Sequence, residues 1–500
     1  MMEPRAQWAS VWGEGEASWL PRRRRWALAL MALGALAALR LPALGAVAFL
    51  IGYVVTAAES LPLGVAIYIL AAPFPLGVVI HHHHFFISDL MAIAIAAMLV
   101  FERRRAGIRQ IVEDLLERAW RAPLLLLFAL SVLSLAVALS HSGTVIKILE
   151  YAEFFVVMVA AVRWTATRPQ IWTLYLVALG AAVAVVALWG LVQFLFALGP
   201  ESNQIALHHV RATGFFGQPN PFGAYAGETF PLLLGLSALG PESVRRHWAP
   251  YAGMALAALG AVESYSRGAW VGDAAAVAVM AALAYWVGGG RMARRLLLLG
   301  VGIPAVLFAV VVLLGKTDFT HQRFHEIWVH ATAAERLTSA VSTAFHPQQS
   351  YDAQQRLLIW RTAIEAIRSH PILGVGLGNF HLFIQAHPPK GLAGGIPPTA
   401  HDLYLEWGAD LGLGGIVAAL WLEWRWIKGA VRAVGRRGAQ LDPFWQAAAL
   451  GAVGTVVAFV VHNTVDFLID HGVVIPLVMA LGLIAGRLSA RRTVRGERRG

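Results

Sequence analysis

The sequence lacks cysteine altogether and is poor in charged residues. Only 14% of its 500 residues are Asp, Glu, Lys or Arg, whereas 58% are hydrophobic. Without cysteine, a disulfide framework and thiol chemistry are both excluded, and the redox compartment stays open. The low charge excludes an ordinary soluble protein, because a soluble chain of this size needs far more charged side chains to cover its surface.

Long apolar runs stand where charge is missing. Runs of about 17 or more residues recur along the chain and predict an all-α polytopic membrane protein. We expect about 12 to 14 transmembrane helices and one large extracytoplasmic loop that contains short helices. The expected spans are residues 26–40, 42–58, 62–80, 85–101, 122–140, 145–163, 170–198, 221–240, 249–264, 268–288, 296–315, 402–427, 444–463 and 472–488.

The net charge of +11 could indicate a nucleic-acid-binding protein or a membrane protein, and the positions of the basic residues distinguish the two. Basic residues cluster at the ends of the apolar runs, as the positive-inside rule expects of a membrane protein and unlike a nucleic-acid-binding surface. We therefore expect membrane lipids as partners and no nucleic acid, with the N-terminus in the cytoplasm. Residues 102–121 are predicted to form an amphipathic helix on the cytoplasmic surface.

This topology divides the chain into four segments. Residues 1–198 hold the N-terminal transmembrane helices, and residues 199–315 hold the central ones with arginine motifs on the outer face. Residues 316–401 form the large extracytoplasmic loop, and residues 402–500 hold the C-terminal transmembrane helices and a basic cytoplasmic tail. Within the loop, residues 354–368 have the apolar spacing of a helix. The candidate chemistry gathers in the outer segments, which predicts a site on the extracytoplasmic side of the cytoplasmic membrane.

His401 stands where the outer loop re-enters the membrane. A segment rich in glycine and proline, residues 394–400, precedes it, and an apolar run starts at Leu403. An imidazole at such a boundary can titrate near neutral pH while it stays in contact with water. Two interpretations stay open at this point, an interfacial histidine that caps a helix and a general base.

Three arginines are predicted to lie on the outer side, against the positive-inside trend. Arg211 lies in an outer loop punctuated by glycine and proline, and Arg267 lies between two apolar spans. Arginine suits a bidentate grip on phosphate oxygens, but each of these two could instead bind lipid headgroups. Arg356, in the loop helix, could be a third cation, but a solvated helix face is the favoured interpretation.

Two histidine-containing segments complete the outer polar set. His81–His84 could bind a divalent metal, but no carboxylate or second histidine cluster flanks them at ligand spacing, so we expect no metal site. His462-Asn463 with Asp466 and Asp470 forms a polar corner that either lines the same cavity as His401 or is a simple turn.

The motif His401-Asp402-x9-Gly412-x2-Gly415 resembles the signature of the bacterial O-antigen ligase and polymerase family. Asp402 replaces the Asn, Ser or Gln that is usual there. Four further segments resemble the family's patterns in the expected order, and the resemblance extends from about Arg211 to Asp466. These segments are Arg211-Ala212-Thr213-Gly214 with Pro219-Asn220, Ser266-Arg267-Gly268, Arg356-x3-Trp360, and Pro371-x2-Gly374-Val375-Gly376-x-Gly378-Asn379-Phe380.

The resemblance implies a membrane glycosyltransferase without a cofactor or a metal. It would transfer a glycan from an undecaprenyl-diphosphate carrier to an acceptor hydroxyl on the outer face of the cytoplasmic membrane. Arg211 and Arg267 match the arginines that hold the donor diphosphate, and His401 matches the histidine that activates the acceptor hydroxyl. A neutral imidazole is a suitable base for a hydroxyl, and two cations can stabilise a pyrophosphate leaving group. Direct displacement would invert the anomeric carbon.

Several functions remain open within and beyond this resemblance. A ligase would use a lipid A core as acceptor, a polymerase another lipid-linked glycan, and a protein O-oligosaccharyltransferase a Ser or Thr hydroxyl; we place the ligase slightly ahead. A lipid-linked oligosaccharide flippase or small-anion transporter is the rival from another class. A flippase should carry charge through a central cavity and show internal symmetry. Here the polar groups concentrate on one side, which favours an enzyme.

Overall fold

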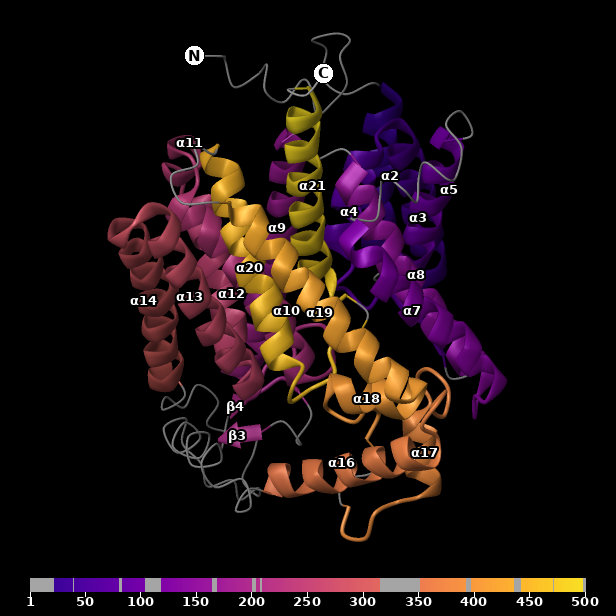
Figure 1. The fold of residues 1–500 in the computed structure, drawn as a ribbon. Helices are drawn as coiled ribbons and strands as arrows, with labels where there is room; N and C mark the ends of the chain where they lie inside the picture. Colours follow the sequence, from indigo (N-terminus) through magenta and orange to yellow (C-terminus); the bar gives the residue numbers. More distant parts are fainter. Residues whose placement is uncertain are drawn as a thin grey trace.

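The computed structural model is a bundle of long helices with a smaller helical layer at one end (Figure 1). It describes residues 22–38, 40–80, 83–103, 118–163, 169–199, 204–206, 209–314, 351–392, 397–435, 442–470 and 472–497. The amphipathic helix expected at residues 102–121 lies almost entirely outside these residues.

The helices follow the expected spans closely. In the N-terminal part these are α2 (Arg22–Ala37), α3 (Pro42–Glu59), α4 (Leu61–Ala71), α5 (Ile87–Arg103), α7 (Arg118–Leu133), the short 3-10 helix η1 (Ser134–Ala136), α8 (His141–Arg163) and α9 (Pro169–Phe196). The central part has α10 (Pro219–Leu239), α11 (Glu242–Arg245), α12 (Ala249–Glu263), α13 (Arg267–Gly288) and α14 (Gly290–Leu314). The C-terminal part has α16 (Tyr351–Ser369), α17 (Phe380–Ala386), α18 (Leu403–Leu411), α19 (Leu413–Val434), α20 (Pro443–His462) and α21 (Ile475–Glu497).

The predicted class, an all-α polytopic membrane protein, is confirmed. Among the described residues, five helices are long and apolar enough to cross a membrane, and four shorter helices are also apolar. The five are Pro42–Glu59, Ile171–Phe196, Arg267–Gly288, Gly290–Leu314 and Pro443–His462. Helices at the edge of the bundle expose large apolar side chains, such as Leu298 and Val306 of α14, as lipid-facing helices must.

Two small antiparallel hairpins interrupt the helical pattern. Strand β1 (Gly77–Ile80) pairs with β2 (His83–Phe86), and β3 (Gln204–Ala206) pairs with β4 (His209–Val210). The span expected at residues 62–80 is therefore too long, because helix α4 ends at Ala71 and the chain turns through two prolines before β1. His83 and His84 lie in β2, whereas His81 and His82 lie outside the described residues.

The span expected at residues 402–427 is two helices rather than one. Gly412 separates α18 from α19 with a φ of 73°, in the left-handed region that glycine adopts without strain. A Cβ atom at this position would lie 2.6 Å from the carbonyl oxygen of Pro371. The break therefore comes from a close backbone approach between the outer loop and the membrane helices, which no apolar pattern reveals.

The centre of the bundle is helix α10. It packs against α12, α13 and α20, and it is buried along nearly its whole length. Such a helix is mostly apolar around its circumference because it has no face to present to water. The smaller layer at one end of the bundle, called the outer layer, contains α16 and α17. It has a separate apolar core, in which Ile359 and Ala363 of α16 contact Phe380 and Phe383 of α17. In Figure 1 this layer lies at the opposite end of the bundle from α11.

The glycine-rich turn of residues 374–378 joins the two layers. Asp410 of α18 accepts hydrogen bonds from the backbone N–H groups of Gly378, Asn379 and Phe380, at 2.6, 3.1 and 2.9 Å. The amide of Asn379 in turn bonds Ser140 N at 2.9 Å and Thr144 Oγ1 at 2.6 Å. The turn therefore fastens α18 to the start of α8, and α18 begins directly after His401.

Candidate active site

His401 occupies a backbone conformation that is unusual for a residue with a side chain. Its φ is 51°, in the left-handed region, where a non-glycine residue is strained unless its surroundings hold it. The preceding residue, Ala400, is held on both sides. Its N–H donates to the Glu406 carboxylate, and its carbonyl accepts a 3.0 Å hydrogen bond from the indole Nε1 of Trp360. The outer helix α16 and helix α18 thus fix the backbone at His401 together.

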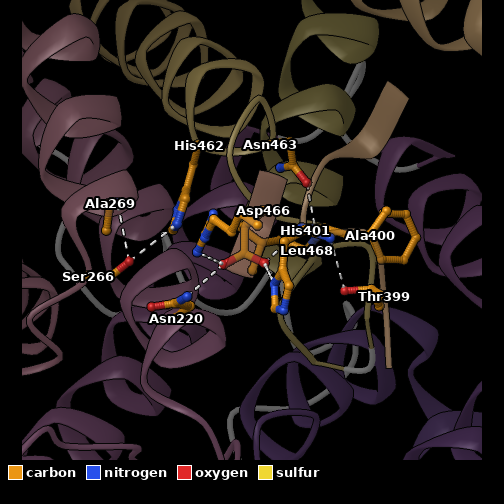
Figure 2. Close-up of polar contacts among 12 residues, drawn as sticks. Asn220, Ser266, Ala269, Thr399, Ala400, His401, His462, Asn463, Asp466 and Leu468 are labelled. Carbon is orange, nitrogen blue, oxygen red and sulfur yellow. Dashed lines mark hydrogen bonds and ion pairs between the residues drawn. The ribbon is translucent and has the colours of Figure 1, made fainter. Parts of the chain in front are cut away.

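The imidazole of His401 pairs with Asp466. His401 Nδ1 lies 2.9 Å from Asp466 Oδ1, and Figure 2 shows the two side chains facing each other. Because a carboxylate only accepts, Nδ1 carries the proton of a neutral imidazole and Nε2 keeps its lone pair. Asp466 is only 7% exposed while His401 is 24% exposed, so the carboxylate is the inner member of the pair. This is the arrangement that a general base requires.

The charge of Asp466 is stabilised by its surroundings. Burial by itself would raise the pKa of this carboxyl. The hydrogen bond from His401 and the positive charge of Arg356 outweigh burial and hold the pKa of Asp466 below its ordinary value. Asp466 is therefore an anion at every pH at which a histidine base would work.

The second oxygen of Asp466 faces two residues from distant parts of the chain. Asn220 Nδ2 donates to Asp466 Oδ2 at 2.7 Å, and Arg356 Nη2 lies 3.9 Å from the same oxygen. Asn220 belongs to the first turn of α10 and Arg356 to the outer helix α16. One buried carboxylate thus gathers residues from the central helices, the outer layer and the start of α18.

Arg211 joins this network through Asn220. Its Nη2 donates to Asn220 Oδ1 at 2.7 Å, and its Nε donates to the carbonyl of Ser264 at 3.0 Å. The guanidinium is therefore held between the start of α10 and the end of α12. The structure brings Arg211, Arg356 and His401 into one hydrogen-bonded and ion-paired group around Asp466.

Arg267 lies at the same end of the bundle, as the first residue of α13. Its neighbour Ser266 caps this helix, and the Ser266 hydroxyl lies 3.3 Å from His462 Nε2 (Figure 2). A Cβ atom at Gly268 would lie 2.3 Å from the His462 ring, so glycine is needed for this approach. His462 and Asp466 also interact electrostatically, which connects the first turn of α13 with the His401 group.

The remaining motif residues shape α18. Asp402 caps this helix by accepting from Leu405 N at 2.8 Å, an ordinary N-cap role that explains why a carboxylate can stand there. Gly412 permits the break after α18, and Gly415 permits α19 to pass the carbonyl of Trp407. These three residues position the chain around His401 through the backbone.

Comparison with known families bears on this same region. Residues 252–420 match a family model described as O-antigen ligase. No curated protein matches the chain.

The matched segment contains Arg267, Arg356 and His401, but the site extends beyond it. Arg211 and Asn220 precede the matched residues, and Asp466 follows them. Among the described residues, no group of three or more His, Asp or Glu side chains is arranged to hold a metal ion. The group around Asp466 holds the imidazoles of His401 and His462 and the guanidinium groups of Arg211 and Arg356, a set that suits an anionic ligand better than a cation.

Several residues of the site do not stand out in the sequence as functional candidates. Asp466 was predicted only as part of a polar corner, and Asn220 and Trp360 only as parts of motifs. Glu406 reads in the sequence as one charge within an apolar run, yet it is 3% exposed and bonds Ala400. A buried ionisable residue at membrane depth is the signal that could have singled out Glu406.

Proposed function

We propose that this protein is a membrane glycosyltransferase of the O-antigen ligase type. It transfers a glycan from an undecaprenyl-diphosphate carrier to an acceptor hydroxyl at the outer face of the cytoplasmic membrane. The match of residues 252–420 to the O-antigen ligase family supports the class of reaction, and the arrangement of His401 supports the mechanism.

The observation that carries the proposal is the 2.9 Å contact between His401 Nδ1 and Asp466 Oδ1. With Nδ1–H directed at the carboxylate, Nε2 accepts the proton of the acceptor hydroxyl. The carboxylate stabilises the imidazolium that forms, and its own low pKa keeps it from taking the proton. General-base assistance of this kind contributes about 10²–10⁴ in rate.

The arginines serve the leaving group. The acceptor oxygen forms a bond to the anomeric carbon while the bond from that carbon to the phosphate oxygen breaks, so the diphosphate departs with the electron pair. Arg211, Arg267 and Arg356 supply positive charge for the developing pyrophosphate anion. A direct displacement inverts the anomeric configuration, and retention of configuration in the product would contradict it.

The arrangement of charge supports an extracytoplasmic site. The His401 group lies at the end of the bundle covered by the outer helices α16 and α17, while α11, with Arg245 in its last turn, lies at the other end (Figure 1). Basic residues at helix ends mark the cytoplasmic side. A site at the outer end meets a lipid-linked donor whose polar head faces away from the cytoplasm.

The test is transfer by the purified protein in nanodiscs, with a fluorescent undecaprenyl-diphosphate glycan as donor and EDTA present. Lipid A core, a second lipid-linked glycan and a Ser/Thr peptide are offered separately as acceptors. We expect transfer by the wild type, loss of transfer in His401→Ala, and weaker transfer in Arg211→Ala and Arg267→Ala. The productive acceptor distinguishes a ligase, which we place first, from a polymerase and a protein O-oligosaccharyltransferase. Movement of the donor between leaflets without any transfer would replace the enzyme by a flippase.

A further inference from the structure

Asn220 lies between an arginine and a carboxylate of the site. Its Oδ1 accepts from Arg211 Nη2 and its Nδ2 donates to Asp466 Oδ2, both at 2.7 Å. The orientation of the amide is fixed by these neighbours, because a guanidinium only donates hydrogen bonds and a carboxylate only accepts them. The side-chain amide offers a separate acceptor and donor for such a pair.

The position of this amide is set by helix α10. Asn220 is the second residue of the helix, between Pro219 and Pro221. Proline suits the first turn of a helix because its missing N–H and its fixed φ cost nothing there. The rest of α10 is buried among α12, α13 and α20. The amide is therefore presented from a rigid element, which matches the needs of a precise site.

A neutral bridge keeps two opposite charges available. If Arg211 bonded Asp466 directly, each would neutralise the other, and both would serve their remaining partners less well. Through the amide, the Asp466 carboxylate faces His401 while the Arg211 guanidinium is held by a neutral group instead of by this carboxylate. The two charged groups are nevertheless held at a fixed separation, because both hydrogen bonds are short.

We propose that Asn220 is a positioning residue that holds Arg211 and Asp466 in register while it keeps their charges apart. The donor diphosphate at Arg211 and the histidine base at Asp466 then act side by side. This inference rests on the proposed function, since it assigns Arg211 to the donor and His401 to the acceptor. It adds a role for a residue that touches neither substrate.

Asn220→Asp is the informative substitution, because it changes charge with almost no change in shape. The new carboxylate pairs with Arg211 and competes with the donor diphosphate, so the donor KM rises about tenfold. The new carboxylate also lies where the amide bonded Asp466 Oδ2 at 2.7 Å, and because two adjacent carboxylates repel each other, the pair holds a proton to a higher pH than Asp466 alone. The acid limb of the pH–rate profile therefore moves to higher pH, by about one unit. A residue with a purely structural role would leave this profile in place.

Asn220→Ala tests the two hydrogen bonds alone, and Gln218→Ala is the control. Asn220→Ala removes both hydrogen bonds without adding charge, so we expect a lower kcat and a donor KM raised about fivefold, with the acid limb unmoved. Gln218 precedes the same helix, is exposed and makes no side-chain cap bond. Gln218→Ala should match the wild type in every measurement, and melting temperatures in nanodiscs show which variants are folded.

The double variant Asn220→Asp with Asp466→Asn exchanges the carboxylate and the amide at constant net charge. It can keep the hydrogen bond between the two positions but moves the negative charge from His401 to Arg211. We expect loss of at least about 100-fold in kcat for this folded variant. Wild-type rates and an unmoved pH profile in both Asn220→Asp and the exchange would overturn the inference while leaving the proposed function intact. A wild type that transfers no glycan would overturn both.

Discussion

Helix α10 passes through two different environments. Toward its C-terminal end, Gly235 packs against α20 so closely that a Cβ atom would lie 2.5 Å from the carbonyl oxygen of Ala447. At its N-terminal end, Asn220 bonds Arg211 and Asp466 instead. The C-terminal end of α10 is held by close packing of small and apolar residues. The N-terminal end is held by polar contacts between residues that are far apart in the chain. Changes at the two ends should therefore affect different properties of the protein.

The largest effect is expected from His401→Ala at the polar end. Loss of the base should reduce kcat about 10³–10⁴-fold, with little change in the melting temperature. His370→Ala, which removes another histidine of the outer layer, is the matched control and should retain the wild-type rate. A rate for His401→Ala within a few fold of the control would remove histidine from the mechanism.

Asp466→Asn tests the negative charge of the Asp466 carboxylate separately from its shape, at the same N-terminal end of α10. The variant keeps the shape of the side chain but loses the anion that supports the imidazolium, so kcat should fall about 10²–10³-fold. Its stability should also respond to pH. Since the folded-state pKa of Asp466 is lowered, this group stabilises the wild type above its ordinary pKa, and the contribution is lost as pH falls through the folded value. The melting-temperature gap between wild type and Asp466→Asn should therefore be wide at pH 7 and narrow as the buffer is acidified toward pH 3.

Gly235→Ala tests the apolar end. Its new methyl group would meet the backbone of α20 and should destabilise the fold by about 1–3 kcal/mol. The expected reading is a lower melting temperature with an unchanged kcat per folded molecule. Gly302→Ala provides the control, because a Cβ atom there meets nothing within 4 Å. A change in the pH profile of Gly235→Ala would show that the two ends of α10 are coupled.

A smaller loss of kcat than in the His401 and Asp466 variants is expected from Trp360→Phe in the outer layer. It removes the indole N–H that bonds the Ala400 carbonyl but keeps an aromatic ring on α16. The left-handed backbone at His401 is then less firmly held, and kcat should fall about tenfold with the donor KM unchanged. If the donor KM rose instead while kcat held, the role of α16 would lie in Arg356 and donor binding.

The sequence predicted the helices of the bundle well, because each apolar run is long and its ends carry basic residues or proline. It also predicted the helix at residues 354–368, which the structure extends to Tyr351–Ser369. It failed at Gly412, where one apolar run is broken by a contact with Pro371. For Arg356 it favoured a solvated helix face, whereas the side chain lies 3.9 Å from a buried carboxylate.

What the sequence alone determined is the class of protein; the outer location of the polar motifs and the role of His401 as a base stay predictions from it. Only the tertiary structure decided which residues act on that histidine. His401 and Asp466 are 65 residues apart in the chain, and Asn220 and Asp466 are 246 residues apart. Apolar periodicity and charge at helix ends are local properties, so they can be read from a short window. A hydrogen-bonded network depends on how distant helix ends meet, and that is set by the packing of the whole bundle.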